Sequence, residues 1–264
     1  EEGKIIDEKL TKECVGKHPD LIGISTVYSS SGSSIRPKVK ISFVLDGITD
    51  KTEIIVREIL ANVSNIKTKI IETPDIWEVK ANNVSFKAAT CPYIITVQDD
   101  MEILEKNFDK RLMKPFKIIN NTLGVTARTA QNERIVKNAL QYYDVAGKDV
   151  NTPRNLFCIR QVIVRGPIMF DHNKLMELDY LDEEFAPITC DEKDLCFRAY
   201  RKGWLVGAYA MNYNSPLGWG KTHDYPYKKQ IFWTDSSERN EKMIIERPSD
   251  LLNEKPHNRD IIIK

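Results

Sequence analysis

The sequence of 264 residues lacks the features that mark several classes of protein. No apolar run approaches the roughly 18 residues that a membrane-spanning helix needs. The first ten residues have neither a basic start nor an apolar core, so they do not form a secretory signal peptide. Charge of one sign is not in excess, since 39 basic residues stand against 38 acidic ones. Nucleic-acid binders usually show a basic excess or stripe, and this balance argues against one.

Cysteine is scarce, and its spacing carries no motif. The five cysteines form no CxxC pair, and an odd number argues against a complete disulfide framework. We therefore expect neither disulfides nor a zinc site, and we expect a reducing, cytoplasmic location. The cysteines are Cys14, Cys91, Cys158, Cys190 and Cys196.

Strand and helix patterns alternate along the chain. At roughly 150 residues per domain, the length fits between one and two domains, or a single large α/β domain. Short apolar runs rich in β-branched residues predict strands, and apolar positions with the helical period predict helices. The expected strands are 21–28, 39–45, 67–72 and 93–97, and the expected helices are 50–63 and 77–90. This alternation predicts a doubly wound α/β fold with a mostly parallel sheet flanked by helices, in which ligands bind beyond the carboxyl ends of the strands.

Acidic residues follow two of the expected strands. Asp46 comes directly after the strand 39–45, where it either contacts a ligand or belongs to a turn before a helix N-cap. Asp99 and Asp100 follow the strand 93–97, and adjacent carboxylates repel each other unless a cation or hydrogen-bond donors offset their charge. Hard divalent cations prefer such oxygen ligands. The pair is therefore a candidate metal site, with a solvated acidic turn as the alternative.

The segment 191–203 predicts a helix that is matched to its own dipole, with acids in its first turn and Gly203 as its stop. Glu192 lies on the apolar stripe of this helix, whereas Asp194 shares a stripe with Arg198 and is expected to be solvated. A carboxylate on the apolar face of a helix is unfavourable unless it has a structural or functional partner. Glu192 is either a partner of the helix dipole or a general base at the floor of a cleft.

Histidine is rare, and one of the four histidines stands in an unusual context. His223 lies in the glycine- and aromatic-rich stretch 218–224, which does not fit a regular helix. A histidine in such a loop is either a metal ligand or a surface imidazole. The others show no partner pattern and are expected at the surface: His18, His172 and His257.

Several segments form an ordered series of short motifs. They are 43–50 (FVLDGITD), 83–93 (NVSFKAATCPY), 94–100 (IITVQDD), 164–167 (VRGP) with 181–185 (LDEEF), and 191–198 (DEKDLCFR) with Gly203 and Trp204. Each motif is weak alone, but in this order and spacing they resemble the family 2 glycosyltransferases of the GT-A fold. The resemblance runs from about Asp20 to about His223, which is most of the chain.

The resemblance implies that the chain binds a nucleotide diphosphate sugar, with a UDP-sugar favoured and a GDP-sugar as the alternative. Ser25 and Thr26, at the end of the first strand, would line the nucleotide-base pocket, and Asp46 would accept a hydrogen bond from the base. Asn83 would lie near the ribose or the sugar. Asp99 would contact the ribose or the metal region.

The resemblance also implies metal-dependent transfer of a hexosyl or deoxyhexosyl group to a hydroxyl of a glycan or glycoconjugate. Asp100 would bind Mn²⁺ or Mg²⁺ across the diphosphate, with His223 as a later metal or diphosphate ligand. Glu192 aligns with the usual catalytic aspartate of the family, and Asp191 aligns with the acid before it. Glu192 would take the proton of the acceptor hydroxyl in a single displacement, which inverts the anomeric centre.

Some positions depart from the family pattern. Gln98 replaces the first acid of the D-x-D motif, and Glu192 is one methylene longer than the usual aspartate. These departures motivate an alternative, a catalytically silent module that binds sugar nucleotides. A nucleotidyltransferase of related fold is a further alternative, but the serine-rich stretch 29–34 is a poor match to the glycine-rich phosphate loop of those enzymes.

The motifs also define an expected organisation of the chain. A lead-in of residues 1–19 precedes one GT-A domain at 20–232, and a polar tail follows at 233–264. The donor half of the domain extends to about residue 105, with the acceptor half after it. Because the sequence does not begin with methionine, we expect a module without a transmembrane segment that belongs to a longer, multi-domain transferase.

Overall fold

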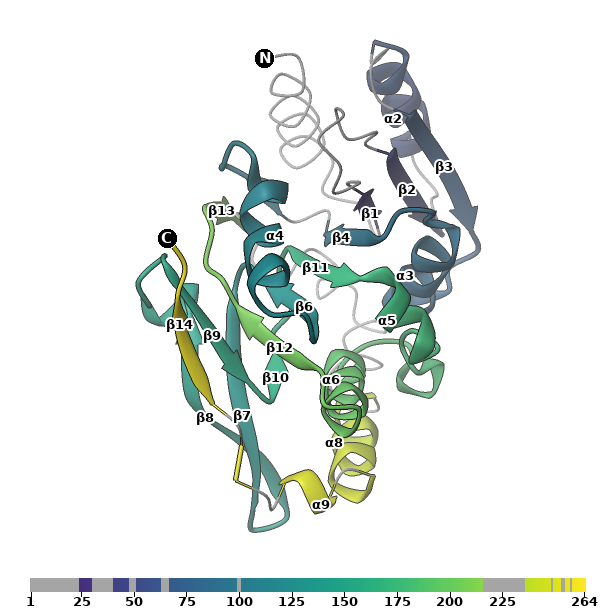
Figure 1. Ribbon diagram of the computed structural model, residues 1–264. Coiled ribbons are helices and arrows are strands. Elements are labelled where there is room, and N and C mark those ends of the chain that lie inside the picture. Colours follow the sequence, from purple (N-terminus) through teal and green to yellow (C-terminus); the bar gives the residue numbers. More distant parts are fainter. Residues whose placement is uncertain are drawn as a thin grey trace.

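A nine-stranded sheet forms the centre of the molecule (Figure 1). The computed structural model describes residues 24–29, 40–47, 51–62, 67–98, 101–215, 236–247, 249–252, 255–256 and 258–264. The strand order is β3-β2-β1-β4-β11-β6-β12-β9-β14, and the smaller sheets join β10-β7-β8 and β13-β5. The central strands are β1 (Ile24–Ser29), β2 (Lys40–Asp46), β3 (Lys67–Thr73), β4 (Tyr93–Val97), β6 (Thr122–Thr126), β9 (Leu156–Arg160), β11 (Ile168–Asp171), β12 (Leu205–Ala208) and β14 (Arg259–Ile262).

Helices and two smaller sheets surround this sheet. The helices are α2 (Thr52–Ala61), α3 (Trp77–Ala88), α4 (Phe108–Ile118), α5 (His172–Glu177), α6 (Asp191–Arg201), α8 (Ser237–Glu246) and α9 (Ser249–Leu252), with 3₁₀ turns η1 (Lys148–Val150) and η2 (Glu183–Phe185). The remaining strands are β5 (Glu102–Ile103), β7 (Thr129–Val136), β8 (Ala139–Gly147), β10 (Val162–Ile163) and β13 (Tyr213–Asn214). No helix among the described residues is long and apolar enough to cross a membrane.

The elements expected from periodicity are present with small shifts at their ends. The runs 39–45, 67–72 and 93–97 form β2, β3 and β4, and the helical patterns form α2, α3 and α6. Gly203 follows the end of α6 with a φ of +71°, the left-handed conformation that ends many helices. The mixed α/β class is therefore confirmed.

Strand direction differs from the prediction of a mostly parallel sheet. β2 pairs with β3 in parallel, as does β6 with β12, but the other neighbours in the central sheet are antiparallel. The reason is that β1, β11 and β9 run against the other strands and are inserted between them. β2, β4 and β6 nevertheless share one direction. Their carboxyl ends therefore point to the same edge of the sheet.

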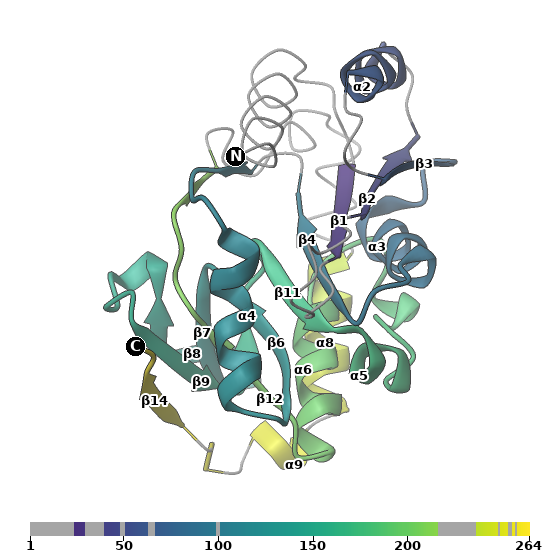
Figure 2. The same cartoon turned by 45° about the horizontal axis from the view of Figure 1, so that its top comes forward.

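Two hydrophobic clusters cover the two faces of the sheet. Neighbouring side chains on a strand point to opposite faces, and Ile94 accordingly packs with α3 and α6, whereas Ile95 packs with α4. On α4, Phe108, Leu112 and Phe116 are buried at a spacing of four residues, which places them on one helical face. Figure 2 shows α4 lying along β6, with α6 and α8 side by side elsewhere in the molecule.

The C-terminal segment is built into this domain. β14 pairs antiparallel with β9 and forms an edge of the central sheet. On α8, Ile244 is fully buried in a cluster that contains Phe185 and Phe197. The described part of the predicted tail 233–264 is therefore two helices and an edge strand, because its few apolar residues are enough to dock it on the body of the domain.

Candidate active site

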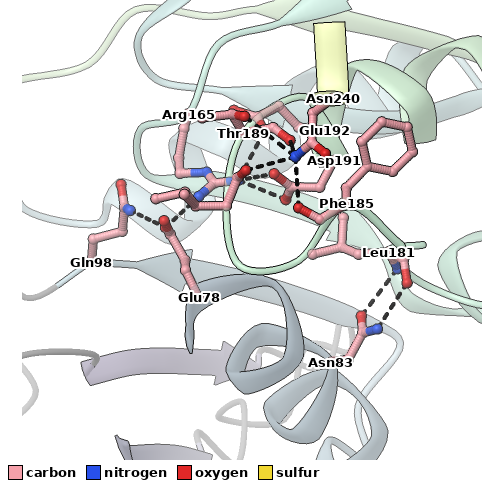
Figure 3. Close-up of polar contacts among 11 residues, drawn as sticks. Glu78, Asn83, Gln98, Arg165, Leu181, Phe185, Thr189, Asp191, Glu192 and Asn240 are labelled. Atoms are coloured by element: carbon pink, nitrogen blue, oxygen red, sulfur yellow. Dashed lines mark hydrogen bonds and ion pairs between the residues drawn. The ribbon is translucent and has the colours of Figure 1, made fainter. Parts of the chain in front are cut away.

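A buried arginine, Arg165, holds three carboxylates together (Figure 3). Its Nη2 atom donates to both oxygens of Asp191 at 2.6 Å and to Glu192 Oε2 at 2.8 Å, and its Nη1 atom pairs with Glu78. We call these four residues the Arg165 cluster. The side chain of Arg165 is 17% exposed and that of Asp191 is 1% exposed. Water screens the charges poorly at such depth, so they act strongly on one another.

The first turn of α3 supplies Glu78. Asp46, the last residue of β2, accepts hydrogen bonds from the backbone N–H groups of Ile76 at 2.9 Å and Trp77 at 2.8 Å, and from the hydroxyl of Thr73 at 2.8 Å. Its carboxylate satisfies donors that the start of a helix leaves free, and it lies at the positive end of the helix dipole. The carboxyl end of β2 thereby fixes the position of Glu78.

Gln98 connects the cluster to the carboxyl end of β4. It follows Val97 directly, and its side-chain amide donates to the carboxylate of Glu78 (Figure 3). An acid at this position, as in the family motif, would repel Glu78. The neutral amide donates a hydrogen bond instead, which explains why a glutamine fits here.

The first turn of α6 supplies the other two carboxylates. Cys190 precedes the helix with a φ of 64° and makes no side-chain cap. Asp191 and Glu192 follow it at the positive end of the helix dipole, where negative charge is stabilised. Both side chains thus have two sources of positive potential, the helix start and Arg165.

Asp191 and Glu192 respond in opposite directions to this environment. Burial raises the pKa of Asp191 well above its ordinary value, because desolvation and the nearby carboxylates outweigh the attraction to Arg165. Burial also acts to raise the pKa of Glu192, but Arg165 and a hydrogen bond from Asp191 outweigh it, so this pKa lies below its ordinary value. The two neighbouring carboxyls therefore differ in proton affinity, with Asp191 holding a proton more readily than Glu192. Such a split between two neighbouring carboxyls is typical of an acid and base pair.

Solved structures with a similar fold include that of GalNAc-T7 with UDP, GalNAc and Mn²⁺. At 11% identity and a TM-score of 0.51, the match covers 73% of this chain and 42% of that chain. This chain has the GT-A fold. A structure of residues 1–349 of S. aureus TarS with UDP is less similar, with 16% identity and a TM-score of 0.42 over 65% of this chain and 48% of that chain. This chain thus spans about half the length of the chains it matches, or less. No family profile matches the sequence, and no curated protein does.

The antiparallel direction of β1 changes where Ser25 and Thr26 lie in the GT-A sheet. Both residues lie in the first half of β1 rather than at its end. Ser25 is in register with Val44, and Thr26 is in register with Val97. Because β1 runs against β2 and β4, its start lies beside their carboxyl ends. The backbone of both residues is therefore near the edge that carries Gln98.

The described contacts of Asn83 are with protein groups, and its expected place beside a ribose or sugar stays a prediction. Its Nδ2 atom donates to the carbonyl of Leu181 at 2.8 Å and to Glu183 Oε1 at 3.1 Å, and its Oδ1 atom accepts from the N–H of Leu181 at 3.0 Å. The residue is 2% exposed. A buried amide needs partners at both ends, and here they are the backbone groups of Leu181. Asn83 joins α3 to the segment that leads into α6.

Asp46 is likewise 2% exposed, and its described contacts hold the start of α3. Its contact with a nucleotide base stays a prediction.

Asp194 was expected to be solvated, and this was wrong, because it is 6% exposed. Its predicted pairing is confirmed, since Arg198 Nε lies 2.6 Å from its carboxylate. Arg198 also donates to two backbone carbonyls, which explains why the pair is drawn inward.

The expected metal ligands Asp100 and His223, and the neighbouring Asp99, lie outside the described residues. Within the part of the chain that the structure describes, no three His, Cys, Asp or Glu side chains are grouped so as to hold a metal ion. The carboxylates of the Arg165 cluster do not fit a metal, because Arg165 already donates to each of them.

Sequence reasoning missed Arg165 and Glu78 as site residues. The only signal was the motif at 164–167, which marks the loop but not the partners of its arginine. The backbone of this loop passes close to Arg128 at Gly166, where a Cβ would lie 2.8 Å from the Cβ of Arg128. A glycine is needed for the backbone to pass this close and bring Arg165 to the start of α6.

Proposed function

We propose that this chain transfers a hexosyl or deoxyhexosyl group from a nucleotide diphosphate sugar to a hydroxyl of a glycan or glycoconjugate, with inversion at the anomeric carbon. The observation that carries the proposal is the place of Glu192 in the first turn of α6, 2.8 Å from Arg165 and beside Asp191, whose pKa is shifted in the opposite direction. A single displacement needs a base that takes the proton as the hydroxyl oxygen attacks. The GT-A fold adds the expectation of a sugar-nucleotide donor, by analogy.

Arg165 sets the strength of this base. While Arg165 donates to Glu192, the carboxylate holds its charge and is a weak base. When an acceptor hydroxyl replaces Arg165 as the donor to Glu192, the carboxylate loses a positive neighbour, so its pKa rises and proton uptake becomes easier. Asp191 and Glu78 remain as partners for the guanidinium. The acceptor would thus convert a resting carboxylate into a working base.

The donor nucleotide would bind at the edge formed by the start of β1 and the carboxyl ends of β2 and β4. Ser25 and Thr26 would line the base, and Asp99 would contact the ribose or the metal region. Asp46 and Asn83 support this site by holding α3. A UDP-sugar is favoured over a GDP-sugar, and the presence of UDP in the similar GalNAc-T7 structure supports this choice.

Asp100 and His223 are the proposed ligands of Mn²⁺ or Mg²⁺. A bound divalent cation would offset the two negative charges of the departing nucleotide diphosphate. The similar GalNAc-T7 structure contains Mn²⁺, which supports a metal in this proposal.

A thermal-shift panel tests the donor. UDP, GDP, CMP and TDP conjugates are added to the chain with and without Mn²⁺, and the Tm is measured. We expect a UDP-sugar to raise the Tm more in the presence of Mn²⁺ than in its absence, because a ligand that binds only the folded state stabilises it. If no nucleotide sugar gives metal-dependent stabilisation, the proposal is overturned.

A catalytically silent sugar-nucleotide binder is the second candidate. It is favoured by Gln98 in place of an acid and by the contact of Arg165 with Glu192. Nucleotide release from each donor, with and without an added glycan, separates the two. Binding without any turnover supports the silent module. Turnover that Glu192→Gln removes, while UDP binding persists, supports the transferase.

A further inference from the structure

The segment 184–190, which leads from η2 into α6, has an irregular backbone. Thr189 has a φ of 77° and Cys190 a φ of 64°, and neither is a glycine. Left-handed backbone at ordinary residues persists only where the surroundings hold it in place. Because Asp191 and Glu192 follow directly, whatever holds this segment also determines where their carboxylates lie.

One side chain of α8 holds much of the segment. The Nδ2 atom of Asn240 donates to the carbonyls of Phe185 at 2.8 Å, Ile188 at 2.8 Å and Thr189 at 3.0 Å (Figure 3). Asn240 itself is fully buried. Backbone carbonyls outside helices and sheets still need donors, and a single amide group supplies them here.

The remaining carbonyls of the segment also have donors. Arg239, the neighbour of Asn240, donates to Ala186 and, at 3.2 Å, to Glu184. The carbonyl of Pro187 accepts from the N–H of Val79 at 3.3 Å. Each carbonyl from residue 184 to residue 189 is therefore bonded, and α8 provides the donor for all but one.

This arrangement connects the path to both sides of the Arg165 cluster. Val79 follows Glu78 on α3, so the bond to Pro187 ties the segment to one carboxylate of the cluster. The carbonyl of Cys190 then accepts the N–H of Asp194 at 2.9 Å as α6 begins. Movement of the segment would shift the first turn of α6 relative to Arg165.

We propose that Asn240 is a positioning residue that orients Glu192 for proton transfer. This inference rests on the proposed function of Glu192 as the base. Asn240 does not touch the reacting atoms. It acts by fixing the backbone that enters α6, so that Glu192 meets Arg165 and, in turn, the acceptor.

The rest of α8 is docked independently of this amide. Ile244 is fully buried, and Arg247 pairs with Asp182 at 2.6 Å and also with Glu184. Loss of the Asn240 side chain therefore removes the bonds to the segment and leaves the anchors of the helix in place. This separation makes the role testable.

The experiment uses two variants and one matched control on the full chain. Asn240→Ala removes the donor, and Asn240→Asp keeps its shape but replaces the donor with an acceptor that repels carbonyl oxygens. Lys242→Ala is the control, because Lys242 lies on the same helix with a side chain that is 76% exposed. Turnover on the nucleotide-sugar panel, the Kd for UDP and the Glu192 pKa are measured. The pKa comes from ¹³C-carboxyl NMR, with the signal assigned by Glu192→Gln.

We expect both Asn240 variants to lower kcat at least tenfold and to leave the Kd for UDP within about twofold, because Asn240 bonds to the segment before α6 and not to the residues of the donor edge. The pKa of Glu192 should rise towards its ordinary value as the contact with Arg165 loosens. Lys242→Ala should match the wild type in all three measurements.

Two failures remain distinguishable. If the wild-type protein turns over no nucleotide sugar, the proposed function fails, while the NMR titration still shows whether Asn240 holds Glu192 in its contact with Arg165. If the Glu192 pKa and kcat stay at wild-type values in a variant that is folded, as judged by its Tm, the positioning role is overturned. Where Asn240→Ala folds poorly, the turnover and the Glu192 pKa are measured on Asn240→Asp instead.

Discussion

The guanidinium of Arg165 donates to Glu192 at 2.8 Å while the same nitrogen donates to Asp191 at 2.6 Å. One cation thus meets two adjacent carboxyls whose pKa values are shifted in opposite directions. Arg165 lowers the pKa of both carboxyls, so the opposite shifts of the two residues arise from the burial of Asp191 and from the contact between the two carboxyls themselves.

Replacing Arg165 with methionine should destabilise the fold strongly. Removing one partner of a buried ion pair leaves unpaired charge and costs about 3–5 kcal/mol. Urea denaturation measures the loss. Arg57→Met is the control, because Arg57 is 55% exposed and its surface pair with Glu53 contributes little to stability. Equal losses in the two variants would contradict a buried, charge-linked cluster.

Asp191→Asn and Glu192→Gln should have unequal effects on sugar transfer. Asparagine resembles a protonated aspartate, so Asp191→Asn should keep most of the activity. Glu192→Gln removes the base and should lower kcat by about 10²–10⁴-fold with little change in UDP binding. Single-turnover kinetics on the donor found in the thermal-shift panel measures both. A larger loss in Asp191→Asn than in Glu192→Gln would reverse the assigned roles.

Stability should depend on pH through Asp191. Its folded pKa is raised above an unfolded value of about 4, so its contribution is fully present below that value and is lost as the pH rises through the folded pKa. Glu192 has the opposite sign, since its lowered pKa adds stability above its ordinary value that is lost in acid. We expect the Tm of Asp191→Asn, relative to the Tm of the wild type, to rise as the pH is raised above about 4. Thermal scans across pH check this, and a constant difference in Tm speaks against the raised pKa of Asp191.

Asp46→Ala should weaken the start of α3 and, with it, the position of Glu78. The carboxylate accepts three hydrogen bonds in a buried site, and we expect a loss of about 2–4 kcal/mol by chemical denaturation. Asp46→Asn keeps one oxygen acceptor and should lose less. If Asp46→Ala abolished UDP binding without lowering stability, the residue would act on the ligand rather than on the helix.

The regular elements were predictable because each has a local pattern. The apolar run 93–97 predicts a strand from neighbouring residues alone. The acids in the first turn of α6 predict a helix start in the same way. The direction of β1 was not predictable, since side-chain alternation is the same in parallel and antiparallel strands. The position of Ser25 along β1 therefore differed from the expectation even though its sheet edge did not.

The candidate site was predictable only in part. Asp191 and Glu192 stand out because acids cluster at a helix start, and a short motif marks the loop of Arg165. The contact between Arg165 and Asp191 joins residues 26 positions apart, so no local pattern reports it. Asn240 is more remote still, since the bonds it makes to the segment before α6 connect residues that are 51 to 55 positions apart.

The pairing of β14 with β9 has a consequence for how the chain is handled as it is made. β9 is synthesised long before Arg259–Ile262 emerges to cover its outer side. Until then its free N–H and C=O groups are a template for strands of other molecules. Fragments that stop short of Arg259 should therefore associate through this open strand, and expression trials do best when they retain the segment that closes it.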